Sequence, residues 1–400
     1  MRGSSTALRL CLAGAITSCA TLTATSSALA NTQKKLGVLL ASHGDIDDID
    51  TELEDYIKTS FKKNVGIPLP FWSRDLLVGP AYALSVQQVS AQYRIIGPTN
   101  YHANSLKQGA AVEKELKSMG VDAKVYLGYN FSRPLIETTL EKMQEDGIES
   151  FVVINKGAQF SYASSGENIE DTLKYLKDHP DFDAEVLGVR QYSDDERFRE
   201  VLANAIDRDA RALFPNTEPE DLCVLVASHG LPQWLIDRKD PAIGQMKAAY
   251  ARLQELLPDY RLYHGFLNDD FIPGAKWVSP DAPTTAEQMK ADGCKNVLMD
   301  GRLSFTTHHR ATFYDLDYDV RNYLETPDTL SNGKVDPNWE KPTVVLAPNF
   351  DEDKEFASYL AQVIKEAFDG TGDAVVTLKL QGETALKPDS VGKPGVDPFF

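Results

Sequence analysis

The chain has 400 residues, of which 42% are apolar and 25% are charged, a composition typical of folded globular domains. Its 59 acidic residues outnumber its 41 basic residues, so the net charge is −18 and the general electrostatic field repels nucleic acid and anionic lipid surfaces. This composition excludes a disordered, collagenous or coiled-coil chain, and we expect no nucleic-acid partner. The length indicates two or three domains.

Residues 1–30 have the pattern of a secretory signal peptide. Arg2 and Arg9 come before the apolar stretch Leu10–Leu22, and the small-residue cleavage site Ala28–Ala30 follows it. The apolar stretch is interrupted by Thr and Ser and is shorter than the roughly 20 residues of a membrane span, so we predict cleavage after residue 30 and no span. Loss of the two arginines lowers the net charge from −18 to −20. We expect an exported protein, periplasmic or extracellular; lipoprotein processing at Cys19, which would leave a lipid anchor, is the weaker alternative.

Two cysteines, Cys223 and Cys294, remain in the predicted mature chain. The first lies in an apparent buried strand, and the second follows Gly293 in a loop. An oxidising compartment would allow a disulfide between them, but their spacing alone does not support one. We therefore expect two unpaired structural cysteines.

From residue 36 onward, short apolar runs alternate with amphipathic stretches. The predicted strands are Leu36–Ala41, Ala123–Leu127, Ser150–Ile154, Ala184–Val189, Leu222–Ala227, Arg261–Phe266, Asn296–Met299 and Thr343–Ala347. The predicted helices between them are Asp47–Lys62, Ser105–Met119, Pro134–Asp146, Ile169–Lys177, Ala242–Leu257, Thr284–Asp292, Thr312–Leu324 and Asp351–Phe368. Continuous apolar strands separated by helices indicate an α/β fold with parallel sheets flanked by helices.

The alternation runs twice, which predicts two Rossmann-like lobes. The first lobe is expected over residues 31–192 and the second over residues 193–386, with a long helix, Asp194–Phe214, linking them. The Gly- and Pro-rich residues 387–400 are expected to form a tail or strap.

Both lobes begin with the same motif at the end of their first strand. Leu39–Gly44 and Leu225–Gly230 share the pattern Leu-x-Ala-Ser-His-Gly, an internal repeat. Ligands of open α/β sheets bind beyond the carboxyl ends of the strands. The repeat therefore predicts that His43 and His229 face one cleft between the lobes.

Several motifs, in order across both lobes, resemble those of ferrochelatases. They are Gly37–Leu40, Tyr93–Gly97, Gln108–Ala111, Leu127–Asn130, Pro134–Glu137, Gln159–Gly166, Ala227–Pro232, Trp277–Asp281 and Phe305–Asp317. This resemblance covers about Lys35–Asp319. It implies the two-lobed chelatase fold and the insertion of a divalent metal ion, Fe²⁺ or Co²⁺, as a substrate into a porphyrin or related tetrapyrrole. No tightly bound cofactor is expected.

The resemblance also implies which histidines act. His229 corresponds to the family's pyrrole-facing histidine, and His309 keeps the histidine of the family's Asp-His-x-Glu pattern. A neutral imidazole accepts a proton or binds a transition metal, so both are expected to be catalytic. The expected metal ligands are His229, His43 and His308. Because adjacent residues point in different directions, we expect at most one of His308 and His309 to reach the metal.

Two positions depart from the family pattern. Ala311 stands where the family has the glutamate that handles protons or relays the metal, and His308 stands where it has the aspartate. Asp315 falls where the family has a second acid, and we expect it to be catalytic. On an α-helix Asp315 and Asp319 would share a face. A solvated acidic face is the alternative.

Four aromatic residues are expected to bind the macrocycle. Tyr101 lies in the segment that lines the porphyrin mouth in the family, although a helix entry capped near Asn104 is the alternative. Phe160 and Tyr162 lie in the Gln159–Gly166 motif, and Trp277 begins the tryptophan motif.

Three functions remain open. We favour an exported metal chelatase acting on a tetrapyrrole. Ala311 suggests instead a non-catalytic binder of tetrapyrrole or metal on a chelatase scaffold. His43 suggests a sirohydrochlorin-type cobalt or nickel chelatase, whose many-carboxylate substrate would need basic residues at the cleft mouth. Arg133, Lys156 and Arg302 are the candidates for that role.

Overall fold

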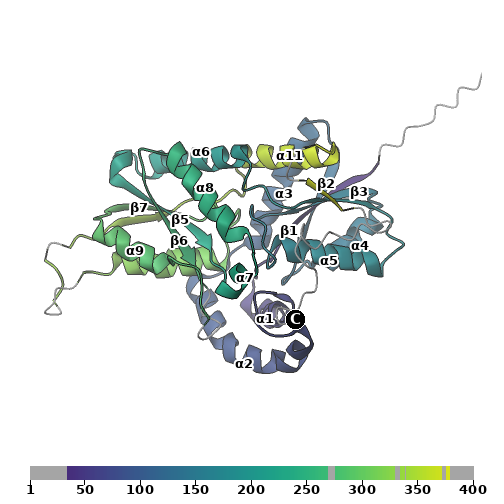
Figure 1. The fold of residues 1–400 in the computed structure, drawn as a ribbon, viewed down its shortest axis with the longest axis horizontal. Helices are drawn as coiled ribbons and strands as arrows, with labels where there is room; N and C mark the ends of the chain where they lie inside the picture. The colour runs from purple at the N-terminus through teal and green to yellow at the C-terminus, as the bar shows by residue number, and fades with distance from the viewer. Residues whose placement is uncertain (1–33, 269–274, 329–333, 338, 372–374, 379–400) are drawn as a thin grey trace, which may run out of the picture. The chain divides into compact units, whose positions relative to one another are not determined.

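The computed structural model describes residues 34–268, 275–328, 334–337, 339–371 and 375–378. The predicted signal peptide, the alternative lipid site at Cys19 and the predicted tail at 387–400 lie outside these residues. The described part of the chain forms the two sheets drawn in Figure 1.

The first sheet is built on four parallel strands in the order β2-β1-β3-β4. They are β1 (Leu36–Ser42), β2 (Ala123–Tyr129), β3 (Ser150–Asn155) and β4 (Glu185–Val189). Every residue of β3 is buried, as expected for a strand covered on both faces.

The second sheet has four parallel strands in the order β6-β5-β7-β8. They are β5 (Leu222–His229), β6 (Arg261–Leu267), β7 (Asn296–Asp300) and β8 (Thr343–Leu346). Its strand order repeats that of the first sheet, so the predicted α/β fold with two related lobes is confirmed. β1 and β5 occupy equivalent inner positions.

Helices lie between the strands as predicted. They are α1 (Ile49–Lys63), α3 (Tyr101–Ser118), α4 (Ile136–Glu145), α5 (Ser165–Asp178), α6 (Glu196–Leu213), α8 (Ala242–Leu256), α9 (Ala282–Ala291) and α11 (Lys354–Phe368). The carboxylates of Asp48, Asp195, Asp281 and Asp353 cap the first turns of α1, α6, α9 and α11. A single buried cluster that includes Leu40, Ile206, Val226 and Leu360 joins both lobes.

Three short elements and one long helix were not predicted from the sequence. The short ones are η1 (Pro219–Asp221), α7 (Gln233–Asp237) and β9 (Val375–Leu378). The long one is α2 (Phe71–Ile96), which contains Pro80. Its Leu76 and Leu84 side chains are exposed while Val89 and Tyr93 are buried, so no single apolar stripe marks it as a helix.

The predicted helix Thr312–Leu324 is instead a π-helix, η2 (Ala311–Val320), followed by α10 (Arg321–Glu325). The i→i+5 hydrogen bonds of a π-helix move the neighbour on a face from four residues away to five. Asp315 accordingly pairs with Arg310, five residues earlier, across 3.3 Å. The α-helical spacing assumed for Asp315 and Asp319 was therefore wrong.

The C-terminal part of the chain returns to the first lobe. β9 pairs antiparallel with β4 and so extends the first sheet. α11 packs on α3 as well as on α6, and Figure 1 shows α6 and α11 along the same side of the two sheets.

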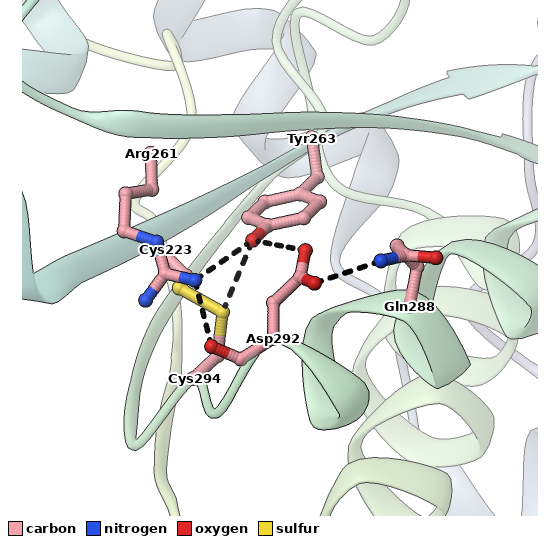
Figure 2. Close-up of a disulfide and its surroundings, with 6 residues drawn as sticks. All are labelled: Cys223, Arg261, Tyr263, Gln288, Asp292 and Cys294. Carbon is pink, nitrogen blue, oxygen red and sulfur yellow. Dashed lines mark hydrogen bonds between the residues drawn. A yellow bond between two sulfur atoms is a disulfide. The ribbon is translucent and has the colours of Figure 1, made fainter.

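Cys223 and Cys294 form a disulfide, so the expectation of two unpaired cysteines was wrong. Cys223 lies on β5 and Cys294 lies just before β7, the strand that pairs with β5, and their Cα atoms are 5.9 Å apart. Figure 2 shows the bridge beside Tyr263 and Asp292. The sequence could not reveal it, because only the sheet order makes β5 and β7 neighbours across a separation of 71 residues.

None of the described helices is both long enough and apolar enough to cross a bilayer.

Candidate functional site

The two Ser-His-Gly motifs lie at the carboxyl ends of β1 and β5. Each needs its glycine because the loop after the neighbouring strand passes close to it. A Cβ on Gly44, whose φ is +84°, would lie 2.0 Å from Ser132 Oγ and 2.8 Å from Tyr129 Cβ, and a Cβ on Gly230 would lie 1.8 Å from Asn268 Oδ1 and 3.0 Å from the backbone oxygen of Leu267. The glycines therefore fix where the chain turns after each histidine.

His43 stands at the end of β1 with a 39% exposed side chain, so it is not part of the first lobe's core. Its ring stacks on Phe131 with 4.9 Å between centroids, and its Nε2 lies 2.6 Å from the carbonyl oxygen of Ala163. Desolvation is the main cause that lowers the pKa of His43 to about 4; the hydrogen bond with the Ala163 backbone opposes this shift, and the charge of His229 adds to it. The imidazole is therefore neutral at physiological pH.

His229 and His309 meet around one aromatic ring in the second lobe. The ring centroid of Phe305 lies 6.0 Å from that of His229 and 4.5 Å from that of His309. Burial lowers the pKa of His309 well below its usual value, and the charge of His229 adds to this effect. His229 thus interacts electrostatically with both His43 and His309. We call His43, His229 and His309 the histidine cluster.

Tyr101, a residue of the first lobe, lies beside His309 of this cluster. It is the first residue of α3 and is buried, with its hydroxyl donating to Ser42 Oγ across 2.9 Å. Its ring lies nearly parallel to that of His309, 6.3 Å away. Burial raises the pKa of Tyr101, so the phenol stays protonated.

His308 lies on a different side from His309. Its Nδ1 is 3.4 Å from the side-chain nitrogen of Asn349, and its ring is 5.0 Å from that of Phe313. Burial lowers its pKa, while the nearby Asp351 opposes the shift. The two adjacent histidines therefore contact different neighbours, and only His309 lies beside Phe305 and Tyr101.

Side chains of the first lobe hold the loop that leads to His309. Gln108 Nε2 donates to the Thr306 carbonyl across 3.0 Å, Gln159 Nε2 to the Leu303 carbonyl across 2.9 Å, and Lys156 Nζ to Thr307 Oγ1 across 2.7 Å. These bonds couple the position of His309 to the first lobe.

Lys156 and Arg302 do not lie where a basic cleft mouth would need them. Lys156 and Arg302 are 3% and 1% exposed, so neither forms a basic cleft mouth, and that interpretation was wrong. Lys156 takes part in the inter-lobe contact, and Arg302 forms ion pairs with Asp300 and Asp209. Arg133 is exposed and lies 3.5 Å from Asp55.

Ala311 is the first residue of η2 and is buried in the second lobe's core. The residue before it, Arg310, donates its backbone N–H to Asp45 Oδ2 of the first lobe across 2.9 Å. The Arg310 side chain binds both Gln92 and Asp315. The Asp315 carboxylate is thus engaged in an ion pair that fixes the start of the π-helix.

The expected macrocycle-binding residues lie in different settings. Phe160 is completely buried in the first lobe's core, so its ring meets no ligand surface in this conformation. The ring of Tyr162 meets the Phe160 ring edge-on at 5.7 Å, and its backbone N–H donates to Asp240. Trp277 pairs with Pro232, three residues after His229, and is half-buried.

Sequence reasoning missed Glu167, which lies in the first turn of α5. Its Oε2 is 3.7 Å from His43 Nε2, and its side chain is 6% exposed. Burial raises the pKa of this carboxyl, while the hydrogen bond from the Val65 backbone N–H lowers it. The only sequence signal was its place directly after Ser165 and Gly166, in a segment already singled out.

Within the described residues, no three His, Cys, Asp or Glu side chains are arranged to hold a metal ion. A cavity of about 680 Å³ opens beside α6 and α11 and is lined by none of the histidines named above.

Comparisons with known proteins identify the family of this chain. The sequence model of the ferrochelatase family matches residues 35–368. The mitochondrial ferrochelatase of Gallus gallus is 24% identical over 306 residues, which cover 74% of each chain. A ferrochelatase of Herpetosiphon aurantiacus is 25% identical over 296 residues, covering 72% of this chain and 88% of that one. A solved structure of SirB from Bacillus subtilis with Fe³⁺ has a TM-score of 0.47 at 12% identity and covers 84% of this chain and 96% of that one. Because the family match spans both lobes and every element of the site, the chain belongs to the ferrochelatase family.

Proposed function

We propose that this chain is a metal chelatase that inserts a divalent metal ion, Fe²⁺ or Co²⁺, into a porphyrin or related tetrapyrrole. Family membership supports the reaction class. The observation that carries the proposal is the histidine cluster: His43 and His229 lie at equivalent strand ends of the two lobes, and the rings of His229 and His309 lie 6.0 and 4.5 Å from that of Phe305. This is where open α/β sheets bind ligands.

The cluster has the chemistry that insertion requires. The macrocycle must lose two pyrrole protons, and the metal ion must be passed to its four nitrogens. A neutral imidazole offers one lone pair for either task, and burial keeps His43 and His309 neutral at physiological pH. Imidazole nitrogen also suits Fe²⁺ and Co²⁺. We propose that His229 and His309 accept the protons and that His43 and His229 meet the metal.

A small ligand set suits a metal that is a substrate. A site closed by four protein ligands holds its metal permanently, as structural zinc sites do. The histidine cluster offers only a few donors, so a metal ion bound there would remain free to pass into the macrocycle.

The test is to titrate the purified protein without residues 1–30 with several tetrapyrroles and with Fe²⁺ or Co²⁺ under anaerobic conditions, following the visible spectrum. We expect metallated product in excess of the protein, which defines turnover. Product that never exceeds the protein would favour a binder, and no spectral change with any tetrapyrrole would refute both functions.

The binder alternative rests on Ala311, and Ala311→Glu tests it. If the wild-type protein is inert and this substitution creates turnover, the binder interpretation is correct. If the wild-type protein turns over and the substitution changes little, the histidines perform the task of the missing glutamate. Because Ala311 is buried, the melting temperature of the variant must be measured alongside.

We also propose that the protein works outside the cytoplasm. The disulfide between Cys223 and Cys294 supports this localisation, because such bridges persist in oxidising compartments. Fractionation of cells that produce the full chain should recover it, without residues 1–30, from the periplasm or the medium. Recovery of the uncleaved chain from the cytoplasm would contradict the localisation.

A further inference from the structure

Glu167 has one carboxylate oxygen that is satisfied and one that is not. Its Oε1 accepts a hydrogen bond from the Val65 backbone N–H across 2.5 Å. Its Oε2 is buried and has no hydrogen-bond partner among the described residues. Burying an acceptor without a partner costs free energy, so the group that this oxygen faces is informative. That group is the Nε2 nitrogen of His43, 3.7 Å away.

The surroundings of His43 determine which ring nitrogen carries the hydrogen. The Ala163 carbonyl oxygen, 2.6 Å from Nε2, can only accept, so Nε2 is the donor. Glu167 Oε2, 3.7 Å from the same nitrogen, lies beyond hydrogen-bond distance but favours a hydrogen on Nε2 electrostatically. In a neutral imidazole the lone pair then lies on Nδ1.

His229 is held in the opposite way. Its Nδ1 lies 2.6 Å from the carbonyl oxygen of Gly230, which again can only accept. Nδ1 is therefore the donor, and the lone pair lies on Nε2. The two histidines of the repeat thus present different nitrogens.

We propose that Glu167 is a positioning residue that, together with the Ala163 carbonyl, holds the Nε2–H of His43 so that the Nδ1 lone pair is the atom that meets the metal ion. This inference rests on the proposed function. Histidine ligands of metals usually donate their other N–H to a carboxylate or a carbonyl, and losing that partner typically costs 10- to 100-fold in metal affinity or activity. Glu167 would then place a carboxylate beside a metal-facing histidine of the first lobe, whereas the second lobe has Ala311 where the family pattern has a glutamate.

Glu167→Gln is the sharpest variant, because it keeps the shape and removes the acceptor. The Val65 N–H requires the single amide oxygen, so the NH₂ group would face the Nε2–H of His43, donor against donor. Glu167→Asp keeps the carboxylate but shortens its reach. The matched control is Asp178→Asn, which makes the same chemical change on the exposed last turn of the same helix, about 16 Å away along its axis.

Two measurements on the protein without residues 1–30 and without tetrapyrrole test the inference. The first is ¹⁵N NMR of the histidine rings, with His43 assigned by its loss in His43→Gln. The second is Co²⁺ affinity by calorimetry. We expect the wild type to carry the His43 proton on Nε2. We expect Glu167→Gln to lower Co²⁺ affinity by about 10- to 100-fold without lowering the melting temperature, with partial recovery in Glu167→Asp and none of the loss in Asp178→Asn.

The inference fails if the wild type carries the His43 proton on Nδ1, a result that needs no metal binding. It also fails if Glu167→Gln keeps both the wild-type His43 spectrum and the wild-type Co²⁺ affinity. A loss of affinity matched by an equal loss in Asp178→Asn, or explained by a lower melting temperature, would assign Glu167 a structural role. The proposed function fails separately, if the wild type metallates no tetrapyrrole.

Discussion

The ends of β1 and β5 carry the same Ser-His-Gly motif but hold their histidines differently. His43 rests on Phe131 and directs Nε2 to the Ala163 carbonyl beside Glu167. His229 directs Nδ1 to the adjacent Gly230 carbonyl and has the edge of Phe305 nearby. The motif and the strand order are repeated, whereas the partners are not. A shared motif therefore sets where each histidine lies, and its neighbours decide which nitrogen acts.

The lobes also differ in covalent support, and removing that support is the largest effect that we predict. The Cys223–Cys294 bridge closes a loop of 71 residues in the second lobe. In the chain-entropy description, replacing both cysteines by alanine should lower the free energy of unfolding by about 4 kcal/mol. Urea unfolding of the double variant and the wild type measures this difference. Equal unfolding midpoints would mean that the bridge contributes nothing to the stability of the fold.

Activity should separate the two histidines next. We expect His229→Ala to lower metal insertion by a factor of about 100 or more, the usual scale for an acid–base group. We expect His43→Ala to lower Co²⁺ affinity more than it lowers the rate of metal insertion. Initial rates and Co²⁺ titrations of both variants test this, with melting temperatures as the control for folding. Unchanged turnover in His229→Ala would remove that residue from the mechanism.

The pH dependence should reveal that histidines of both lobes are neutral in the folded protein. His264 lies on β6, where its ring stacks on that of Tyr250. Desolvation lowers the pKa of His43 and of His264 to about 4, so NMR titration should show both protonating near pH 4 rather than near 6.5. The unfolded chain then binds more protons between these two values, so each histidine adds stability above pH 6.5 that is lost as the pH falls towards 4.

A variant comparison isolates this effect on stability, because buried carboxyls such as Glu167 and Asp45 have raised pKa values and act in the opposite direction. When the pH is lowered from 6.5 to 4, the melting temperature of His264→Gln should decrease less than that of the wild type. Identical losses would contradict the neutral state of the half-buried His264.

The smallest effect concerns the acid on the π-helix. Asp315 is paired with Arg310 and partly exposed, so Asp315→Asn should change the free energy of unfolding by less than about 1 kcal/mol. Its catalytic role stays a prediction, and the turnover of the same variant tests it. A loss comparable to that of His229→Ala would make Asp315 the functional substitute for the missing glutamate and would move the reactive centre further into the second lobe.

Local patterns in the sequence determined the two-lobed α/β fold, the eight parallel strands and the repeated histidines, because buried parallel strands are continuous apolar runs and the motif sits at a strand end. Helix α2 was missed because its apolar residues lie on more than one face, and the π-helix was missed because its residues also suit an α-helix.

Only the tertiary structure decided which distant groups meet. The disulfide depends on β5 and β7 being neighbours, and the burial of Lys156 and Arg302 depends on partners contributed by other segments. The approach of Glu167 to His43 joins residues 124 positions apart in the chain, because α5 begins beside the end of β1. The sequence pattern does not indicate these contacts, because charged residues such as Lys156, Arg302 and Glu167 are equally common on exposed surfaces.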